Sequence, residues 1–363
     1  MHSQGNARTG IIKTKHGNIS TPCFVPVATQ AAAKALTTAQ LNEVGSQILM
    51  VNTYHTFLRP GMEVIKKFGG LHEFMGWNKP LMTDSGGFQI FSLGKQNAAK
   101  VQGNTITFKS PRDATLHEFT PSRSMQIQET LGADIIFALD ECIDFHTPYE
   151  QVKESVKRTH DWAKECLVSH ERNHQLLYGI VQGGKFQDLR THSSEFIGAL
   201  DFQGFGVGSL FGEPKEESKN VLKWAMSGLP REKPVHMLGI GQVDDIFDAV
   251  EQGADTFDCV LATRLARMGY VFSSECTKRS KWRYRITNAK FRLDRKPFDK
   301  NCACWACTNH SRAYLHHLFK ADELLAYTLA SYHNVAFFHT LLTQIRESIE
   351  QNTLAQLRKK WLR

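Results

Sequence analysis

Eight short apolar runs, separated by segments with helical periodicity, constrain the fold of this chain most strongly. Each run is short and apolar enough to be a buried strand. The expected strands are Pro22–Val27, Gln47–Val51, Pro80–Thr83, Asp134–Leu139, Leu176–Val181, Phe205–Gly208, Val235–Ile240 and Asp255–Leu261. Strands that alternate with helices eight times predict an α/β fold, namely a (β/α)8 TIM barrel.

The segments between these runs place apolar residues at helical spacing. This spacing is clear after Pro148 and in Asp244–Gln252, where Gly253 suits the position just past a helix end. The other expected helices are Leu36–Val44, Glu63–Phe68, Ser122–Leu131, Phe186–Leu200 and Lys215–Met226. Lys95–Glu118 is more polar, and we expect it to form a hairpin inserted into the barrel.

Composition favours a cytoplasmic protein with a large core. Hydrophobic residues make up 41% of the 363 residues, but no run approaches the roughly 20 apolar residues of a membrane helix. Residues 1–8 lack the apolar stretch of a secretory signal. Of the eight cysteines, five are scattered, which is not the pattern of a secreted disulfide framework.

Polar residues occur at nearly every expected strand end. In a (β/α)8 barrel, these ends converge on one mouth, where active sites lie. The residues are Asn52, Asp84, Asp140, Gln182, Ser209 and, within the eighth run, Asp258. One such Asp is often a helix cap, but three carboxylates at one mouth are hard to explain by capping. Two carboxylates can together split a glycosidic bond, one by attacking the anomeric carbon and one by moving protons.

The third carboxylate suits recognition of a nitrogen heterocycle. Asp140 can accept hydrogen bonds from ring and exocyclic N–H groups, and Gln182 can both donate and accept, which fits a guanine-like edge. Phe88 could stack on the base. Glycine pairs such as 86–87 and 183–184 would let the backbone approach a flat ligand, although a tight turn explains any one pair equally well.

Cys302-x-Cys304-x2-Cys307 has the spacing of a metal site. Three thiolates can share one tetrahedral ion, usually zinc, and leave one position for a fourth ligand. His333 follows an expected helix, Ser311–Ala330, and could fold back to fill it. A closed Cys3His site would be structural and hold one Zn²⁺. An iron–sulfur cluster and free cysteines are the alternatives. We expect a barrel over residues 1–285, with an N-terminal cap, and a zinc-binding subdomain with C-terminal helices over residues 286–363.

Positive charge is concentrated between Arg264 and Lys300. This stretch holds twelve Lys and Arg against three acids, a net +9, while the whole chain carries +8. Such a concentration is typical of contacts to a phosphate backbone, although a solvated basic loop is the plainer reading. Interleaved aromatic residues favour nucleic-acid binding.

Together these motifs resemble the tRNA-guanine transglycosylases of the bacterial type, also called queuine tRNA-ribosyltransferases. The resemblance runs from about residue 7 to near the C-terminus. The motifs that carry it are Asn52-Thr53-Tyr54-His55, Leu81–Gln89, Asp140-Glu141-Cys142, Gly179–Gly184, Phe257–Leu261 with Thr263-Arg264, and the three cysteines with His333. The family is a zinc-containing (β/α)8 barrel, works as a homodimer, and exchanges guanine at the first anticodon position of certain tRNAs for a 7-deazaguanine base.

The resemblance implies a role for each matching residue. Asp258 corresponds to the nucleophile that attacks the ribose, and Asp84 to the general acid/base. The base pocket would comprise Asp140, Gln182, Ser85, Cys142, Phe88, Leu238, the backbone N–H of Ser209 and the backbone C=O of Leu210. Arg264 and Arg267 correspond to arginines near the anticodon loop, which is single-stranded and can present a splayed-out base.

The chain departs from the family pattern in the loop that reads the incoming base. Gly208–Glu213 is one residue shorter than the bacterial pattern, with Ser209 in place of a glycine. A shortened loop could admit the cyclopentenediol arm of queuine, so queuine and 7-aminomethyl-7-deazaguanine both stay open as the incoming base.

Three other readings compete with this one. A non-catalytic tRNA-binding partner subunit of the same fold would lack the nucleophile, but Asp258 and Asp84 are both present. A metal-dependent barrel hydrolase would need metal ligands at the strand ends, where no histidine cluster is found. A glycosidase acting on sugars would leave the cysteine motif and the basic stretch unexplained.

Overall fold

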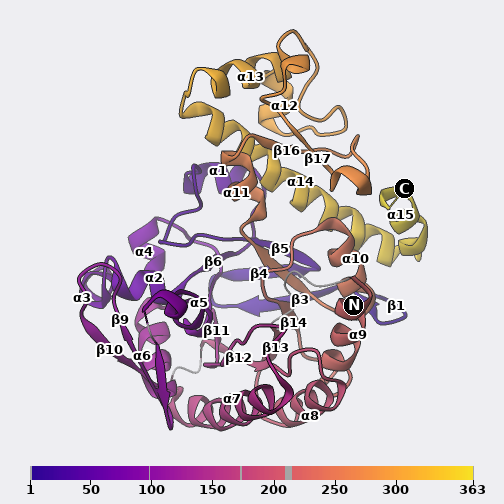
Figure 1. The fold of residues 1–363 in the computed structure, drawn as a ribbon. Helices are drawn as coiled ribbons and strands as arrows, with labels where there is room; N and C mark the ends of the chain where they lie inside the picture. The colour runs from indigo at the N-terminus through magenta and orange to yellow at the C-terminus, as the bar shows by residue number, and fades with distance from the viewer. Residues whose placement is uncertain (1, 98, 172–173, 209–214, 363) are drawn as a thin grey trace.

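The chain forms a closed barrel of eight parallel strands (Figure 1). The computed structural model describes residues 2–97, 99–171, 174–208 and 215–362. Neighbouring strands follow the order β5-β15-β14-β13-β12-β11-β7-β6, and a bridge between Val27 and Met50 joins the two ends. The Ala28 N–H also donates to the Met50 carbonyl over 2.6 Å. The (β/α)8 barrel expected from the sequence is therefore confirmed.

All eight expected strands are present. They are β5 (Cys23–Pro26), β6 (Leu49–Val51), β7 (Leu81–Thr83), β11 (Ile135–Phe137), β12 (Leu176–Val181), β13 (Gly204–Val207), β14 (Val235–Met237) and β15 (Thr256–Cys259). Most are shorter than their apolar runs. After β14 and β15, the last residues of the run (Leu238–Ile240 and Val260–Leu261) leave the ladder and line the mouth of the barrel.

Helices follow the strands and cover the barrel (Figure 1). They are α1 (Thr38–Glu43), α2 (Thr53–Leu58), α3 (Met62–Lys67), α4 (Leu71–Met75), α5 (Gly87–Asn97), α6 (Pro121–Leu131), α7 (Tyr149–Ser169), α8 (Gln187–Gly198), α9 (Lys215–Met226), α10 (Val243–Glu251) and α11 (Leu261–Arg267). Local signals set their ends: Thr120 caps α6 ahead of Pro121, and Gly253 follows α10 with a φ of +99°. None of the helices described here has the length and apolarity to cross a membrane.

The polar insertion differs from the expected hairpin. Its first residues, Lys95–Asn97, complete α5. The rest forms a three-stranded antiparallel sheet of β8 (Lys100–Gln102), β9 (Thr105–Lys109) and β10 (Leu116–Phe119). The third strand forms because Phe119 and Ile106, which pair across the sheet, are both fully buried.

The N-terminal segment closes the opposite end of the barrel. It forms two hairpins, β1 (Ser3–Gln4) with β2 (Ala7–Arg8) and β3 (Gly10–Thr14) with β4 (Gly17–Thr21). Ile12 and Ile19 of the second hairpin join the core inside the barrel. His16, in its turn, places Nδ1 2.8 Å from the Asp134 carboxylate at the start of β11.

Asp134 is the polar centre of this closed end. Its carboxylate accepts the backbone N–H of Leu81 over 2.9 Å and that of His16 over 3.1 Å, and His72 lies 3.4 Å away. The His16 and His72 rings stack at 3.7 Å. Although burial opposes its charge, hydrogen bonds from these partners lower the pKa of Asp134 to about 2. The ionised carboxylate therefore stabilises the fold.

Replacing Asp134 with Asn is expected to lower the free energy of unfolding at pH 7 by about 2 kcal/mol, because buried N–H donors lose an ionised acceptor. Since the folded pKa lies below the ordinary value of 3.8, this contribution is present above about pH 4 and is lost as the pH falls toward 2. Urea unfolding at pH 7 and at pH 3 measures it. Asp161→Asn, at an exposed ion pair with Lys157, is the control and should cost little. A substituted protein as stable as the wild type at pH 7 would contradict the assignment.

The C-terminal region has its own small hydrophobic core. Its one long helix packs against both this core and the barrel. The region contains β16 (Tyr270–Phe272), η1 (Lys278–Ser280), β17 (Arg283–Arg285), η2 (Ala289–Phe291), α12 (Trp305–Asn309), α13 (Arg312–Lys320), α14 (Leu325–Glu350) and α15 (Leu354–Trp361). The first turns of α14 pack in the small core, whereas Phe338 stacks on Phe24 of β5 at 4.8 Å. In Figure 1, α14 runs from the α12–α13 region down to the barrel.

Candidate active site

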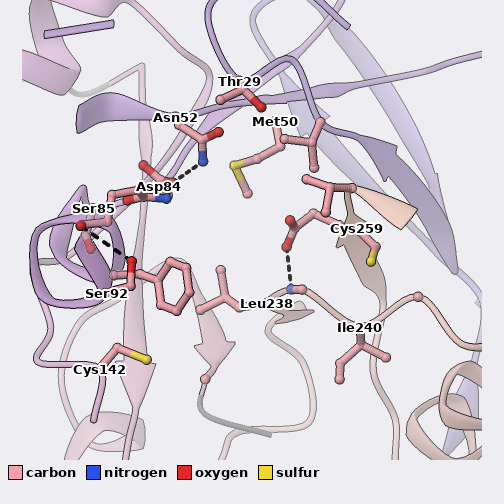
Figure 2. Close-up of a pocket in the computed structure, with 18 of the residues that line it drawn as sticks. Thr29, Met50, Asn52, Asp84, Ser85, Ser92, Cys142, Leu238, Ile240 and Cys259 are labelled. Carbon is pink, nitrogen blue, oxygen red and sulfur yellow. Dashed lines mark hydrogen bonds between the residues drawn. The ribbon is translucent and has the colours of Figure 1, made fainter. Parts of the chain in front are cut away.

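A cavity of about 620 Å³ opens at the carboxyl ends of the barrel strands. Its lining includes six residues expected there: Asn52, Asp84, Asp140, Gln182, Leu238 and Asp258. They come from loops that follow five strands and from β15 itself. The fold therefore gathers into one space residues that are far apart in the sequence (Figure 2).

Asp84 follows β7 directly and is held on both carboxylate oxygens. Oδ1 accepts the Thr53 N–H over 2.8 Å, and Oδ2 accepts from Asn52 Nδ2 over 2.5 Å (Figure 2). Gln89 Nε2 also donates to Oδ2 over 2.8 Å. Burial raises the pKa of Asp84, these hydrogen bonds oppose the rise, and the nearby Asp258 carboxylate adds to it. A raised pKa suits a carboxyl group that must both give and take a proton.

Asp258 lies in β15 and faces the cavity with part of its carboxylate accessible. Oδ1 accepts the Gly239 N–H over 2.8 Å and lies 3.1 Å from His236 Nε2. His236 Nδ1 in turn lies 2.9 Å from Thr256 Oγ1, so the imidazole is fixed between two side chains of β15. Oδ2 has no hydrogen-bond partner among the residues the structure describes. One oxygen is thus anchored while the other is available to react.

Sequence reasoning missed His236. It lies in the middle of β14 and is fully buried, so it gives no strand-end signal. Its partner Asp258 is 22 residues away. Their contact arises from the parallel register, in which His236 pairs with Thr256, and an isolated apolar run does not reveal that register.

Asp140 and Gln182 form a polar pair on the cavity wall. Gln182 Nε2 donates to Asp140 Oδ2 over 2.7 Å, and the Ser85 hydroxyl donates to Oδ1 over 2.8 Å. Burial raises the pKa of Asp140 to about 6, against the hydrogen bonds from Gln182 and Ser85. The carboxylate is therefore mostly ionised at neutral pH and can accept N–H groups from a heterocycle.

The remaining expected base contacts fall into two groups. Phe88, Leu238, Ser85 and Cys142 all line the cavity, and Phe88 is 46% exposed, which leaves much of its ring accessible to a flat ligand. Ser209 and Leu210 lie outside the described residues, so their expected contacts with the incoming base stay predictions.

Basic residues lie beside this mouth. Arg264, in α11, is exposed and lines the cavity. Arg267 is partly buried and donates to the Thr263 carbonyl over 2.9 Å. From Arg264 to Lys300, every Lys and Arg except Arg267 and Arg283 is exposed. The concentrated charge expected from the sequence is therefore presented to solvent.

The cysteine motif and His333 come together as a metal-binding cluster. Their ligand atoms all lie within 4.8 Å of one another, with His333 Nδ1 3.2 Å from Cys307 Sγ and 3.6 Å from Cys304 Sγ. Ligands bound tetrahedrally to zinc at about 2.0–2.3 Å would be separated by about 3.5 Å. His333 Nε2 lies 2.7 Å from the Phe272 carbonyl, so its proton sits there and Nδ1 faces the thiols. Hydrogen bonds from the Cys302 and Cys307 thiols lower the pKa of Cys304, which favours a thiolate there, and the same contacts raise the pKa of Cys307. The residues fit a metal ion.

The position of His333 in the chain's secondary structure differs from the one expected from the sequence. The expected helix Ser311–Ala330 is in fact two helices, α13 and α14, separated by a turn in which Asp322 has a φ of +54°. His333 therefore does not fold back after a helix. It lies inside α14, whose first turns pass alongside α12 and its cysteines.

Comparisons with known proteins show the family of this chain. A family model described as queuine tRNA-ribosyltransferase matches residues 3–363. A queuine tRNA-ribosyltransferase of Herpetosiphon aurantiacus is 45% identical over 362 residues, covering 99% of this chain and 90% of that protein. Another, from Thermoanaerobacter sp. (strain X514), is 44% identical over 363 residues, covering 99% and 95%. This chain therefore belongs to the queuine tRNA-ribosyltransferase family.

Proposed function

We propose that this enzyme replaces a guanine at the wobble position of the tRNA anticodon with a 7-deazaguanine base. The observation that carries the proposal is one cavity in which Asp258 and Asp84 adjoin the Asp140–Gln182 pair. Two carboxylates suit ribosyl transfer, and the pair suits a guanine edge. The names of the relatives agree with exchange in tRNA.

In the first step, Asp258 acts as the nucleophile. Its unanchored oxygen attacks C1′ of the ribose while the bond from C1′ to guanine breaks, so a ribosyl ester forms on Asp258. The Gly239 N–H holds the other oxygen 2.8 Å away and keeps the carboxylate oriented. Asp84, whose pKa is raised, gives its proton to the departing guanine.

In the second step, the incoming base regenerates the carboxylate of Asp258. Asp84, now ionised, removes a proton from the ring nitrogen of the incoming base. That nitrogen attacks C1′, and the ester bond to Asp258 breaks. One glycosidic bond has replaced another, with no net change in protons.

The affinity for guanine is expected to depend on pH through Asp140. Because its pKa is about 6, the carboxylate becomes protonated as the pH falls from 7.5 to 5 and loses the capacity to accept N–H groups. The KM for guanine should rise about tenfold over this range, measured by incorporation of labelled guanine into an anticodon stem-loop. In the Asp140→Asn variant, the KM should be high and insensitive to pH. A KM that stays constant in the wild type would contradict this role.

The basic stretch between Arg264 and Lys300 supports binding of the anticodon loop, with Arg264 in the cavity lining and Arg267 in the same helix, α11. Trp305 and Tyr314 are exposed, and His310 stacks on Tyr314 at 5.1 Å and contacts Trp305; this aromatic group supports a homodimer through the C-terminal region. A substrate of this kind also supports a cytoplasmic location.

For the metal site, we propose one structural Zn²⁺ per chain, held by Cys302, Cys304, Cys307 and His333. Four protein ligands would fill the coordination sphere, which leaves no position for a substrate. We keep the division into a barrel (residues 1–285) and a zinc-binding subdomain (residues 286–363). The small core around Cys307 and Leu315 supports a separate C-terminal unit, and Ala266 and Val271 from the barrel side of the boundary also pack in it.

We propose queuine as the incoming base, because the Gly208–Glu213 loop is shorter than the bacterial pattern. Competition of queuine and of 7-aminomethyl-7-deazaguanine against labelled guanine in tRNA tests this choice. Displacement by queuine is the expected result, and displacement by the aminomethyl base alone would overturn it.

A further inference from the structure

A fully buried arginine lies beside the part of the cavity wall that carries Gln182. Arg190 projects from the first turns of α8, and its side chain has no exposure to solvent. Its guanidinium donates to three backbone carbonyls: Gly184 over 2.8 Å, Gly208 over 3.0 Å and Val181 over 3.2 Å. Burial lowers the pKa of Arg190 to about 10, so the group is still charged at neutral pH. A buried charged group that donates hydrogen bonds to backbone carbonyls holds those backbone segments in fixed positions.

These carbonyls belong to the two segments that form the wall. Val181 is the last residue of β12, Gly184 lies two residues beyond Gln182 in the loop that follows, and Gly208 follows β13. Gln182 and Gly208 both line the cavity. The same helix holds Gln182 a second time, because Ser193 Oγ accepts the Gln182 N–H over 3.2 Å. Helix α8 therefore forms hydrogen bonds to the backbone on both sides of Gln182, the residue that faces the base.

The part of the cavity wall around Gln182 is closely packed. A Cβ added at Gly208 would lie 2.8 Å from Gln182 Nε2, so only a glycine leaves room for the Gln182 amide in its present position. A Cβ added at Gly183 would lie 2.7 Å from the Arg190 backbone nitrogen, so this loop packs directly on the helix. The amide of Gln182 in turn donates to Asp140 over 2.7 Å. The position of Gly208 therefore affects where Gln182 and Asp140 lie.

A planar guanidinium is needed to donate hydrogen bonds to these three carbonyls in fixed directions. The guanidinium has five N–H donors arranged in one plane, whereas the lysine ammonium is a compact point charge on a flexible stem. Substitution by Lys keeps the charge but not the simultaneous hydrogen bonds to the carbonyls of Val181, Gly184 and Gly208.

We propose that Arg190 is a positioning residue for base recognition: it holds Gly208 and the loop after β12 so that Gln182 and Asp140 meet the guanine edge. The proposal rests on the proposed function, since it takes Gln182 as a base contact. Arg190 does not touch the reacting atoms, and its effect is on affinity for the base rather than on the chemical steps.

The test compares steady-state guanine exchange in the wild type, Arg190→Lys and Arg346→Lys, with an anticodon stem-loop as the RNA. Arg346 is a matched control, because its guanidinium grips the Pro22 carbonyl at the opposite end of the barrel over 2.6 Å. For Arg190→Lys, the KM for guanine is expected to rise about tenfold, which corresponds to one misplaced recognition contact. Its kcat and its KM for RNA should stay within about threefold of the wild type.

A purely structural role predicts a different pattern. It would lower the unfolding midpoint while leaving the guanine KM unchanged in the folded fraction, and that result would overturn the proposal. If Arg190→Lys does not fold, Gly208→Ala decides, because its methyl group displaces Gln182 directly and should raise the guanine KM in the same way; an unchanged KM would again overturn it. Failure of the proposed function is distinct, since the wild type would then incorporate no guanine at all.

Discussion

Asp258→Asn is expected to lower the rate of guanine exchange by about 10⁴-fold or more, because an amide cannot form the ribosyl ester. The substitution leaves the fold intact. The side-chain oxygen of Asn can still accept the Gly239 N–H that now binds Asp258 over 2.8 Å. RNA binding should therefore stay within a few-fold of the wild type. Incorporation of labelled guanine and equilibrium binding of the stem-loop measure the two quantities separately.

The matched control is Asp245→Asn, which removes another carboxylate from the same cavity. Asp245 contacts neither Asp258 nor Asp84 through a hydrogen bond in the described part of the chain. Its loss should reduce exchange less than tenfold. Comparable losses in both variants would mean that the cavity needs negative charge in general, and would contradict a nucleophilic role for Asp258.

Loss of the metal ion is expected to have the largest effect on stability. Structural zinc sites contribute on the order of 10 kcal/mol in isolated modules. Here part of that is offset by the small core around Cys307, so we expect Cys307→Ser to cost about 5 kcal/mol. The unfolding midpoint should fall by on the order of 10 °C. Calorimetry and elemental analysis of the same preparations measure the midpoint and the metal content.

The effect should reach the active site through α14. His333 is held to the Phe272 carbonyl, while Asn334 Oδ1 accepts the Phe272 N–H over 2.9 Å. Asn334 Nδ2 donates to the carbonyls of Ala262 and Tyr270, each over 3.0 Å. Ala262 lies in α11, which begins two residues after the last residue of β15. Removal of the metal ion should therefore weaken RNA binding as well as stability.

Cys276→Ser is the control, since Cys276 is partly buried in the same region but lies outside the cluster. It should keep one metal ion per chain and a midpoint close to that of the wild type. A Cys307→Ser protein with normal stability, or a wild type without metal, would contradict a structural metal site. An iron–sulfur cluster would instead show iron and sulfide in the elemental analysis.

The barrel could be predicted from the sequence because each strand is buried on both faces and appears as a short apolar run. Leu176–Val181 is the clearest case, since expected and observed bounds coincide. Where the pattern was weak, the structure differed. The polar insertion gained a third strand because Phe119 is buried, and Ser311–Ala330 was broken at Asp322. Neither feature is visible in local periodicity, because tertiary packing decides both.

For the site, strand-end position located Asp84, Asp140, Gln182 and Asp258, since the barrel brings all strand ends together. It did not locate His236 or Arg190. Both are fully buried polar residues, His236 inside a buried strand and Arg190 in a helix of mixed polarity, and their partners come from other strands and loops. Their contacts depend on register and on loop geometry, which single-sequence patterns do not contain.

The most direct test of the covalent mechanism is to trap its intermediate. The protein is incubated with an anticodon stem-loop and a 9-deazaguanine-type inhibitor, denatured, and analysed on a gel and by mass spectrometry beside Asp258→Asn. We expect a wild-type adduct whose mass equals protein plus RNA minus guanine, linked at Asp258 and absent from the variant. No adduct despite tight RNA binding, or an adduct that persists in Asp258→Asn, would contradict it.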